Sequence, residues 1–101
     1  MKRIVLLCAG GMSTSVLVNQ MKIEARKKKL ELDIEAYPIE SVPTAGENAD
    51  CILLAPQISY RLDEVKAIIN CPIDVIDMQL YGMMDGTQVL ENTLSLLESS
   101  L

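Results

Sequence analysis

Strand-like and helix-like hydrophobic patterns alternate along this chain, and this alternation restricts its possible folds more than any other feature. Residues 3–7 form an almost continuous run of β-branched and leucine side chains, which is typical of a strand buried on both faces. A helix is expected from residue 13 to about residue 28, because Leu17, Met21 and Ala25 recur there at four-residue spacing among polar residues. The chain therefore begins with a strand, a loop and a helix.

The remaining sequence continues this alternation. Further strands are expected at residues 33–37, 51–55 and 73–76; the first of them is expected to be more exposed and the second to be buried. A short helix is predicted from Leu62, Val65 and Ile69, and a C-terminal helix from Leu90, Leu94 and Leu97. Residues 38–49 show little helical pattern and are expected to be irregular, while the glycine-bounded residues 81–86 are expected to form a loop.

These elements predict one α/β domain over residues 1–101, with a four-stranded parallel sheet and helices on both faces. In such sheets, ligands bind outside the carboxyl ends of the strands, where the strand order reverses. If the first strand lies between the second and the third, that crevice opens at Cys8. The loops near Pro56, Gln57 and residues 81–86 should border the same crevice.

Composition excludes several classes of function. The net charge is -5, which disfavours binding to nucleic acid or anionic lipid, and the basic run at residues 26–29 lies where the first helix should end. The chain has no histidine, so it cannot build a Ser-His-Asp triad, a Cys-His dyad or a Cys-His zinc site. No apolar run is long enough for a targeting signal or a membrane span.

The three cysteines have no C-x-x-C spacing and imply no disulfide framework, so a reducing cytoplasm is the expected compartment. Cys51 opens a buried strand and Cys71 precedes a proline, and both are interpreted as structural.

The segment CAGGMSTS at residues 8–15 is the main candidate site. A cysteine between a strand end and a helix N-terminus faces unpaired backbone N–H groups and a positive dipole end, both of which favour the thiolate nucleophile. The same groups can cradle a phosphate. Cys8 is therefore the catalytic candidate, and the phosphate-binding candidates are Ala9, Gly10, Gly11, Met12, Ser13, Thr14 and Ser15. The alternative is purely structural: a buried cysteine, a Gly-Gly turn and a hydroxyl helix cap.

Three segments resemble the enzyme IIB component of the lactose/cellobiose branch of the bacterial phosphoenolpyruvate-dependent sugar phosphotransferase system. They are CAGGMSTS at 8–15, NADCILLAPQISY at 48–60 and VIDMQLYGMMDG at 75–86. The resemblance covers nearly the whole chain and implies a type-3 IIB domain over residues 1–101. It also implies a three-layer fold with strand order 2-1-3-4, similar to that of the low-molecular-weight tyrosine phosphatases.

The resemblance further implies a cytoplasmic phosphotransferase without a metal or other cofactor. Cys8 would accept phosphate from a phosphohistidine of enzyme IIA. It would pass that phosphate to a β-linked disaccharide, of the cellobiose or diacetylchitobiose type, bound by the membrane permease IIC. The chain itself would neither enter the membrane nor bind nucleic acid.

Two rival functions remain open from the sequence. A phosphatase or arsenate reductase could use a similar loop, but the phosphatases have arginine six residues after the cysteine, where this chain has Thr14, and the chain contains no Asp-Pro dipeptide for a general acid. A non-catalytic anion-binding module would use the same loop without a covalent step. The missing arginine favours a site that carries phosphate over one that hydrolyses it.

Overall fold

A four-stranded parallel sheet forms the middle layer of the molecule, with the strand order β2-β1-β3-β4 that was expected. The computed structural model describes residues 1–10 and 13–99. Its strands are β1 (Lys2–Cys8), β2 (Leu32–Pro38), β3 (Cys51–Leu54) and β4 (Ile73–Val75). All four predicted strands are therefore confirmed, and each of their ends is shifted by one residue or less. The central position of β1 puts its carboxyl end between the ends of β2 and β3.

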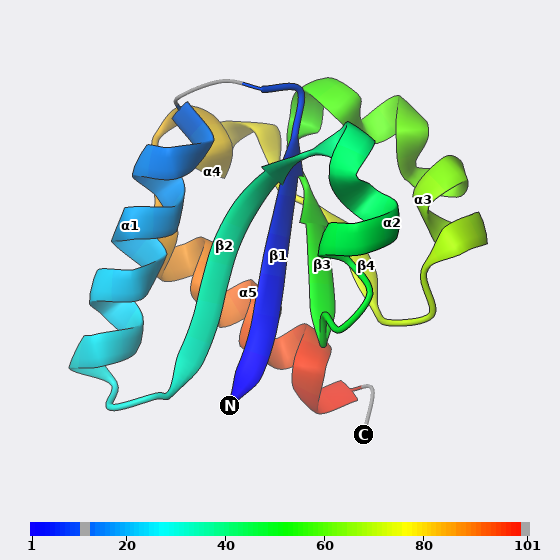
Figure 1. Ribbon diagram of the computed structural model, residues 1–101. Helices are drawn as coiled ribbons and strands as arrows, with labels where there is room; N and C mark the ends of the chain where they lie inside the picture. The colour runs from blue at the N-terminus through cyan, green and yellow to red at the C-terminus, as the bar shows by residue number, and fades with distance from the viewer. Residues whose placement is uncertain (11–12, 100–101) are drawn as a thin grey trace.

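Helices cover both faces of the sheet, as predicted (Figure 1). Helix α1 (Ser13–Lys27) packs with α5 (Gly86–Ser99) on one face, and α5 passes behind the sheet in Figure 1. The opposite face carries α2 (Val42–Ala45) and α3 (Leu62–Ile68). Helix α4 (Met78–Gly82) lies beside the first turn of α1. Helix α1 therefore begins near the carboxyl edge of the sheet and runs back toward the amino edge.

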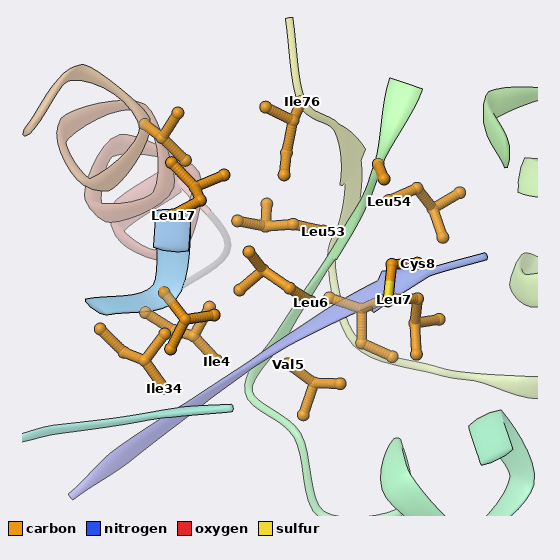
Figure 2. Close-up of a cluster of buried hydrophobic side chains, with 14 of the residues drawn as sticks. Ile4, Val5, Leu6, Leu7, Cys8, Leu17, Ile34, Leu53, Leu54 and Ile76 are labelled. Atoms are coloured by element: carbon orange, nitrogen blue, oxygen red, sulfur yellow. The ribbon is translucent and has the colours of Figure 1, made fainter. Parts of the chain in front are cut away.

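The core is built on β1, whose residues from Ile4 to Leu7 are fully buried. Successive side chains of a strand point to opposite faces, so Ile4 and Leu6 face one helical layer while Val5 and Leu7 face the other. Figure 2 shows Leu6 on the side of the strand that carries Leu17 of α1. Burial on both faces explains why the sequence pattern of β1 is continuous rather than alternating.

Two expectations about connecting segments were wrong. Residues 38–49 are not irregular throughout, because they contain the 3-10 helix η1 (Ile39–Ser41) and the one-turn helix α2. A four-residue helix is too short to show an apolar repeat, although it buries Val42 and Ala45. The predicted loop at 81–86 begins inside α4, since the Asp77 carboxylate accepts hydrogen bonds from the first-turn N–H groups and stabilises this short helix.

A second 3-10 helix, η2 (Pro56–Arg61), connects β3 to α3 and was not predicted. In the part of the chain that the structure describes, no helix combines the length and apolarity needed to cross a membrane.

Candidate active site

Cys8 lies at the carboxyl edge of the sheet, where the sequence placed the candidate crevice. It is the last residue of β1 and is paired with Pro38 at the end of β2. On the other side, the Ala55 N–H donates a hydrogen bond to the Leu7 carbonyl oxygen at 2.9 Å, so β3 ends beside the same position. The central strand therefore delivers the sulfur to the middle of the edge, flanked by two strand ends.

The Cys8 side chain is mostly covered, with 6% of its surface exposed. Its Sγ lies 3.6 Å from the Tyr37 carbonyl oxygen, to which the neutral thiol donates a weak hydrogen bond. Figure 2 shows the sulfur at the end of the buried cluster that β1 contributes to the core. Covalent chemistry at this sulfur requires loss of the thiol proton and of its bond to Tyr37.

The residues that follow Cys8 turn away from the sheet. Ala9 and Gly10 are exposed, and Gly10 has a φ of +107°, a conformation that L side chains adopt only with strain. Of the other phosphate-binding candidates, Gly11 and Met12 lie outside the described residues, as does the side chain of Ser13. The first glycine of the Gly-Gly pair is therefore required by the backbone itself.

Helix α1 begins with Ser13 and presents its N-terminus near the carboxyl edge. The helix is 15 residues long and has no acidic residue in its first turn. Because first-turn N–H groups have no partners within a helix, and because the dipole is positive there, this end favours an anion. Ser15 is exposed in the same turn.

Thr14 is placed differently from an open phosphate ligand. Its side chain is 1% exposed, and its Oγ1 lies 2.8 Å from the Tyr81 hydroxyl, in a hydrogen bond that either group can donate. Tyr81 belongs to α4 and is itself buried. This contact joins residues 67 positions apart in the sequence. Local spacing contained no signal for it, although residues 81–86 were expected to border the crevice.

The other segments expected at the crevice also follow strand ends. Pro56 and Gln57 begin η2 directly after β3 and Ala55. The Ile76 N–H donates to the Leu54 carbonyl oxygen at 2.9 Å, which brings the start of α4 to the same edge. The parallel sheet therefore gathers η2, α4 and the first turn of α1 at the edge that holds Cys8.

The other two cysteines lie toward the opposite edge of the sheet, and all three are free. Cys51 begins β3, and burial raises its pKa to about 12, with smaller contributions from Cys71, Asp74 and Asp50. Burial also raises the pKa of the Cys71 thiol. Both groups are therefore neutral thiols at physiological pH, which agrees with their interpretation as structural residues.

The candidate site offers an anion backbone N–H groups rather than cationic side chains. Residues 8–15 contain no lysine or arginine. Among the residues that the structure describes, no three cysteine, aspartate or glutamate side chains cluster as a metal site needs. Such an arrangement can bind an anion next to a cysteine sulfur, but residues 8–15 supply no cationic side chain to stabilise negative charge on that anion.

Known proteins share both the sequence and the fold. Residues 3–92 match the family model described as the lactose/cellobiose-specific IIB subunit of the PTS system. The chain is 39% identical, over 96% of its length and 97% of the relative's, to the oligo-beta-mannoside-specific EIIB component of Bacillus subtilis. It is 41% identical to the galactose-specific EIIB component of Lactococcus lactis subsp. cremoris, covering 88% of this chain and 90% of that one.

A solved structure extends this similarity to three dimensions. The solution structure of the cellobiose-specific phosphotransferase IIB component from Borrelia burgdorferi superposes with a TM-score of 0.82 at 33% identity, covering 97% of this chain and 93% of that chain. The family match, the relatives and the 2-1-3-4 sheet agree with one another. The chain belongs to the lactose/cellobiose-specific IIB subunits of the sugar phosphotransferase system.

Proposed function

We propose that this IIB subunit carries a phosphoryl group on Cys8, which it accepts from a phosphohistidine of enzyme IIA in the cytoplasm. The observation that carries the proposal is the position of Cys8 between the end of β1 and the N-terminus of α1. Cys8 then passes the group to a β-linked disaccharide, of the cellobiose or diacetylchitobiose type, bound by the permease IIC. The chain needs no cofactor for either step.

The first step begins when the Cys8 proton leaves for solvent and the bond to the Tyr37 carbonyl is lost. The sulfur attacks phosphorus in line with the phosphorus–nitrogen bond. A phosphorus–sulfur bond forms as the phosphorus–nitrogen bond breaks, and the histidine nitrogen keeps the electron pair. In the second step a sugar hydroxyl attacks the same phosphorus and its proton leaves for solvent; a phosphorus–oxygen bond forms as the phosphorus–sulfur bond breaks, and the sulfur keeps the electron pair as the thiolate.

Backbone N–H groups of residues 9–15 bind the equatorial phosphoryl oxygens in this proposal. The exposure of Gly10 and its positive φ support a loop that wraps closely around an anion. Thr14 contributes its N–H, because its hydroxyl is engaged with Tyr81. The hydroxyls of Ser13 and Ser15 are further candidate donors. Without an arginine, the loop stabilises transferred phosphate less than a phosphatase loop does, so hydrolysis by water stays slow.

The surface around the site supports contact with a protein partner. Met78 and Met83, at the two ends of α4, are exposed by 75% and 66%. Exposed methionines adapt to different apolar surfaces, which suits a subunit that must dock first on IIA and then on IIC. We assign α4 to the surface that both partners contact in turn.

Phosphoryl transfer can be measured directly by mass spectrometry. The purified chain is incubated with phosphoenolpyruvate, the general transfer proteins of the system and enzyme IIA, and the phosphorylated peptide is identified. We expect one phosphoryl group on the peptide that contains Cys8. Cys8→Ser should abolish the transfer, since an unactivated hydroxyl is a poor nucleophile at neutral pH. Cys71→Ser is the matched control, because this cysteine lies away from the site, and it should retain the transfer.

Two outcomes would contradict the proposal. Persistent phosphate transfer in Cys8→Ser would exclude the sulfur as the carrier, and Cys8-dependent turnover of an aryl phosphate would favour the phosphatase alternative. The sugar can be tested separately by growth of a strain lacking this gene on several β-linked disaccharides. The named relatives are specific for different sugars, oligo-beta-mannoside and galactose, so the sugar is selected outside the features they share with this chain.

A further inference from the structure

We propose that Tyr81 is a positioning residue for the Cys8 site, which acts by holding Thr14 and thereby the first turn of α1. The inference rests on the proposed phosphoryl transfer and extends it to a residue far from Cys8 in the sequence. Tyr81 itself does not touch the phosphoryl group. It fixes the direction in which the N–H groups at the start of α1 point.

The contact between the two residues is short and shielded from water. The Tyr81 hydroxyl lies 2.8 Å from Thr14 Oγ1, and the two side chains are only 7% and 1% exposed. Hydrogen bonds between buried groups are not weakened by competing water, and loss of the Tyr81 hydroxyl removes a bond that water does not readily replace at the buried Thr14. The bond is therefore suited to hold one geometry rather than to tether a mobile surface.

Thr14 is the second residue of α1, so its backbone N–H is among those left unpaired at the helix start. A bond to its side chain limits rotation of this turn about the helix axis. Because oxyanion stabilisation depends on donors that already point at the developing charge, a small reorientation of these N–H groups weakens it. Tyr81 can thus influence Cys8 chemistry without reaching the sulfur.

Tyr81 lies in a helix that is held by backbone hydrogen bonds and by an N-cap. Its N–H donates to the Asp77 carbonyl oxygen at 2.9 Å, and its own carbonyl accepts from the Met84 N–H at 3.1 Å. The Asp77 carboxylate caps the same helix by accepting from the N–H groups of Gln79 and Leu80. Helix α4 therefore presents the phenol to Thr14 from a capped helix that continues, after a short turn, into α5.

A purely structural bond and a positioning bond differ in their effect on Cys8. If the bond only joins α4 to α1, its loss loosens the site. The sulfur then reacts with iodoacetamide as fast as before, or faster because it is more exposed. If the bond orients N–H groups that favour the thiolate, its loss makes the sulfur less reactive while the fold persists. The rate at which iodoacetamide alkylates Cys8 at neutral pH distinguishes the two, and it needs no partner protein.

The test uses Tyr81→Phe, Thr14→Val and the double variant, with Tyr60→Phe as the matched control because Tyr60 is 81% exposed. Tyr81→Phe should slow both phosphorylation by IIA and alkylation of Cys8 by about tenfold, the effect of losing one buried hydrogen bond. The double variant should be no slower than the slower single variant, since both remove the same bond. Thr14→Ser keeps the hydroxyl, so it should retain most of the wild-type rates of phosphorylation and alkylation that Thr14→Val loses. The control should match the wild type.

Several results would overturn the inference. Unchanged or faster alkylation in Tyr81→Phe would reduce the bond to a structural one, and additive losses in the double variant would show that the two hydroxyls act independently. If Tyr81→Phe does not fold, the comparison of Thr14→Ser with Thr14→Val decides the question alone. Failure of IIA to phosphorylate the wild type would reject the proposed function, whereas the alkylation rates would still judge the role of Tyr81.

Discussion

Gly86, the first residue of α5, lies directly against the backbone of α1. A Cβ atom placed on Gly86 would lie 2.5 Å from Gln20 Cβ, 2.8 Å from the Gln20 carbonyl carbon and 2.8 Å from the Met21 nitrogen. Two of these atoms are backbone and cannot rotate away. We therefore predict that Gly86→Ala forces the two helices apart.

The size of the effect follows from these distances. Carbon atoms in contact are normally about 3.5 Å apart, so α5 must move away from α1 by about 1 Å. Inserting a methyl group into a close-packed interior costs about 1–3 kcal/mol, and a clash with backbone belongs at the upper end of that range. For a domain of this size, a loss of about 2.5 kcal/mol in the free energy of unfolding lowers the Tm by about 10–20 °C.

Thermal unfolding followed by circular dichroism, together with urea titration, measures this loss. Gly82→Ala is the matched control, because it makes the same substitution at the exposed end of α4, where a Cβ would meet no atom of the described residues outside its own helix turn within 4 Å. The control should keep the wild-type Tm or raise it slightly, since alanine has the higher helix propensity. If the free energy of unfolding of Gly86→Ala lies within about 1 kcal/mol of the wild-type value, the two helices can move apart with little loss of packing, and the prediction is refuted.

The remaining predictions concern the loop and the buried thiol. Gly10→Ala should slow phosphorylation of Cys8 by about tenfold, because a side chain at a φ of +107° is strained by about 1–2 kcal/mol, although no atom of the described residues beyond its chain neighbours lies within 4 Å of the new Cβ. The rate is measured by the mass-spectrometric assay with Cys71→Ser as control, and an unchanged rate would contradict the need for glycine. The pKa of Cys51 is about 12 in the folded protein and about 8.5 in the unfolded chain. The stability that the neutral Cys51 thiol contributes is therefore complete below the unfolded pKa and is lost as the pH rises toward 12. Urea unfolding of the wild type and of Cys51→Ala at increasing pH should therefore show an extra decline in the wild type alone, by up to about 1.4 kcal/mol per pH unit, and parallel curves would contradict this assignment.

Much of the fold could be predicted because its signals are local. Burial on both faces makes β1 a continuous apolar run, and the four-residue spacing of Leu17, Met21 and Ala25 defines the inner face of α1. The short helices were missed for the same reason, since η1 and α2 contain too few residues to show a period. Residue 81 was assigned to a loop although the Asp77 cap extends a helix as far as Gly82.

The sequence by itself determined the setting of Cys8, the candidate nucleophile. A cysteine that ends a buried strand and precedes a helix faces unpaired N–H groups whatever the rest of the chain does, because strand end, loop and helix start are consecutive. Only the tertiary structure decided how the hydroxyl of Thr14 is used. Its partner Tyr81 lies 67 residues away and comes within 2.8 Å through the packing of α4 beside α1. Local patterns depend on neighbours along the chain, whereas this contact depends on the order of the strands, which places α4 and the start of α1 at the same edge of the sheet.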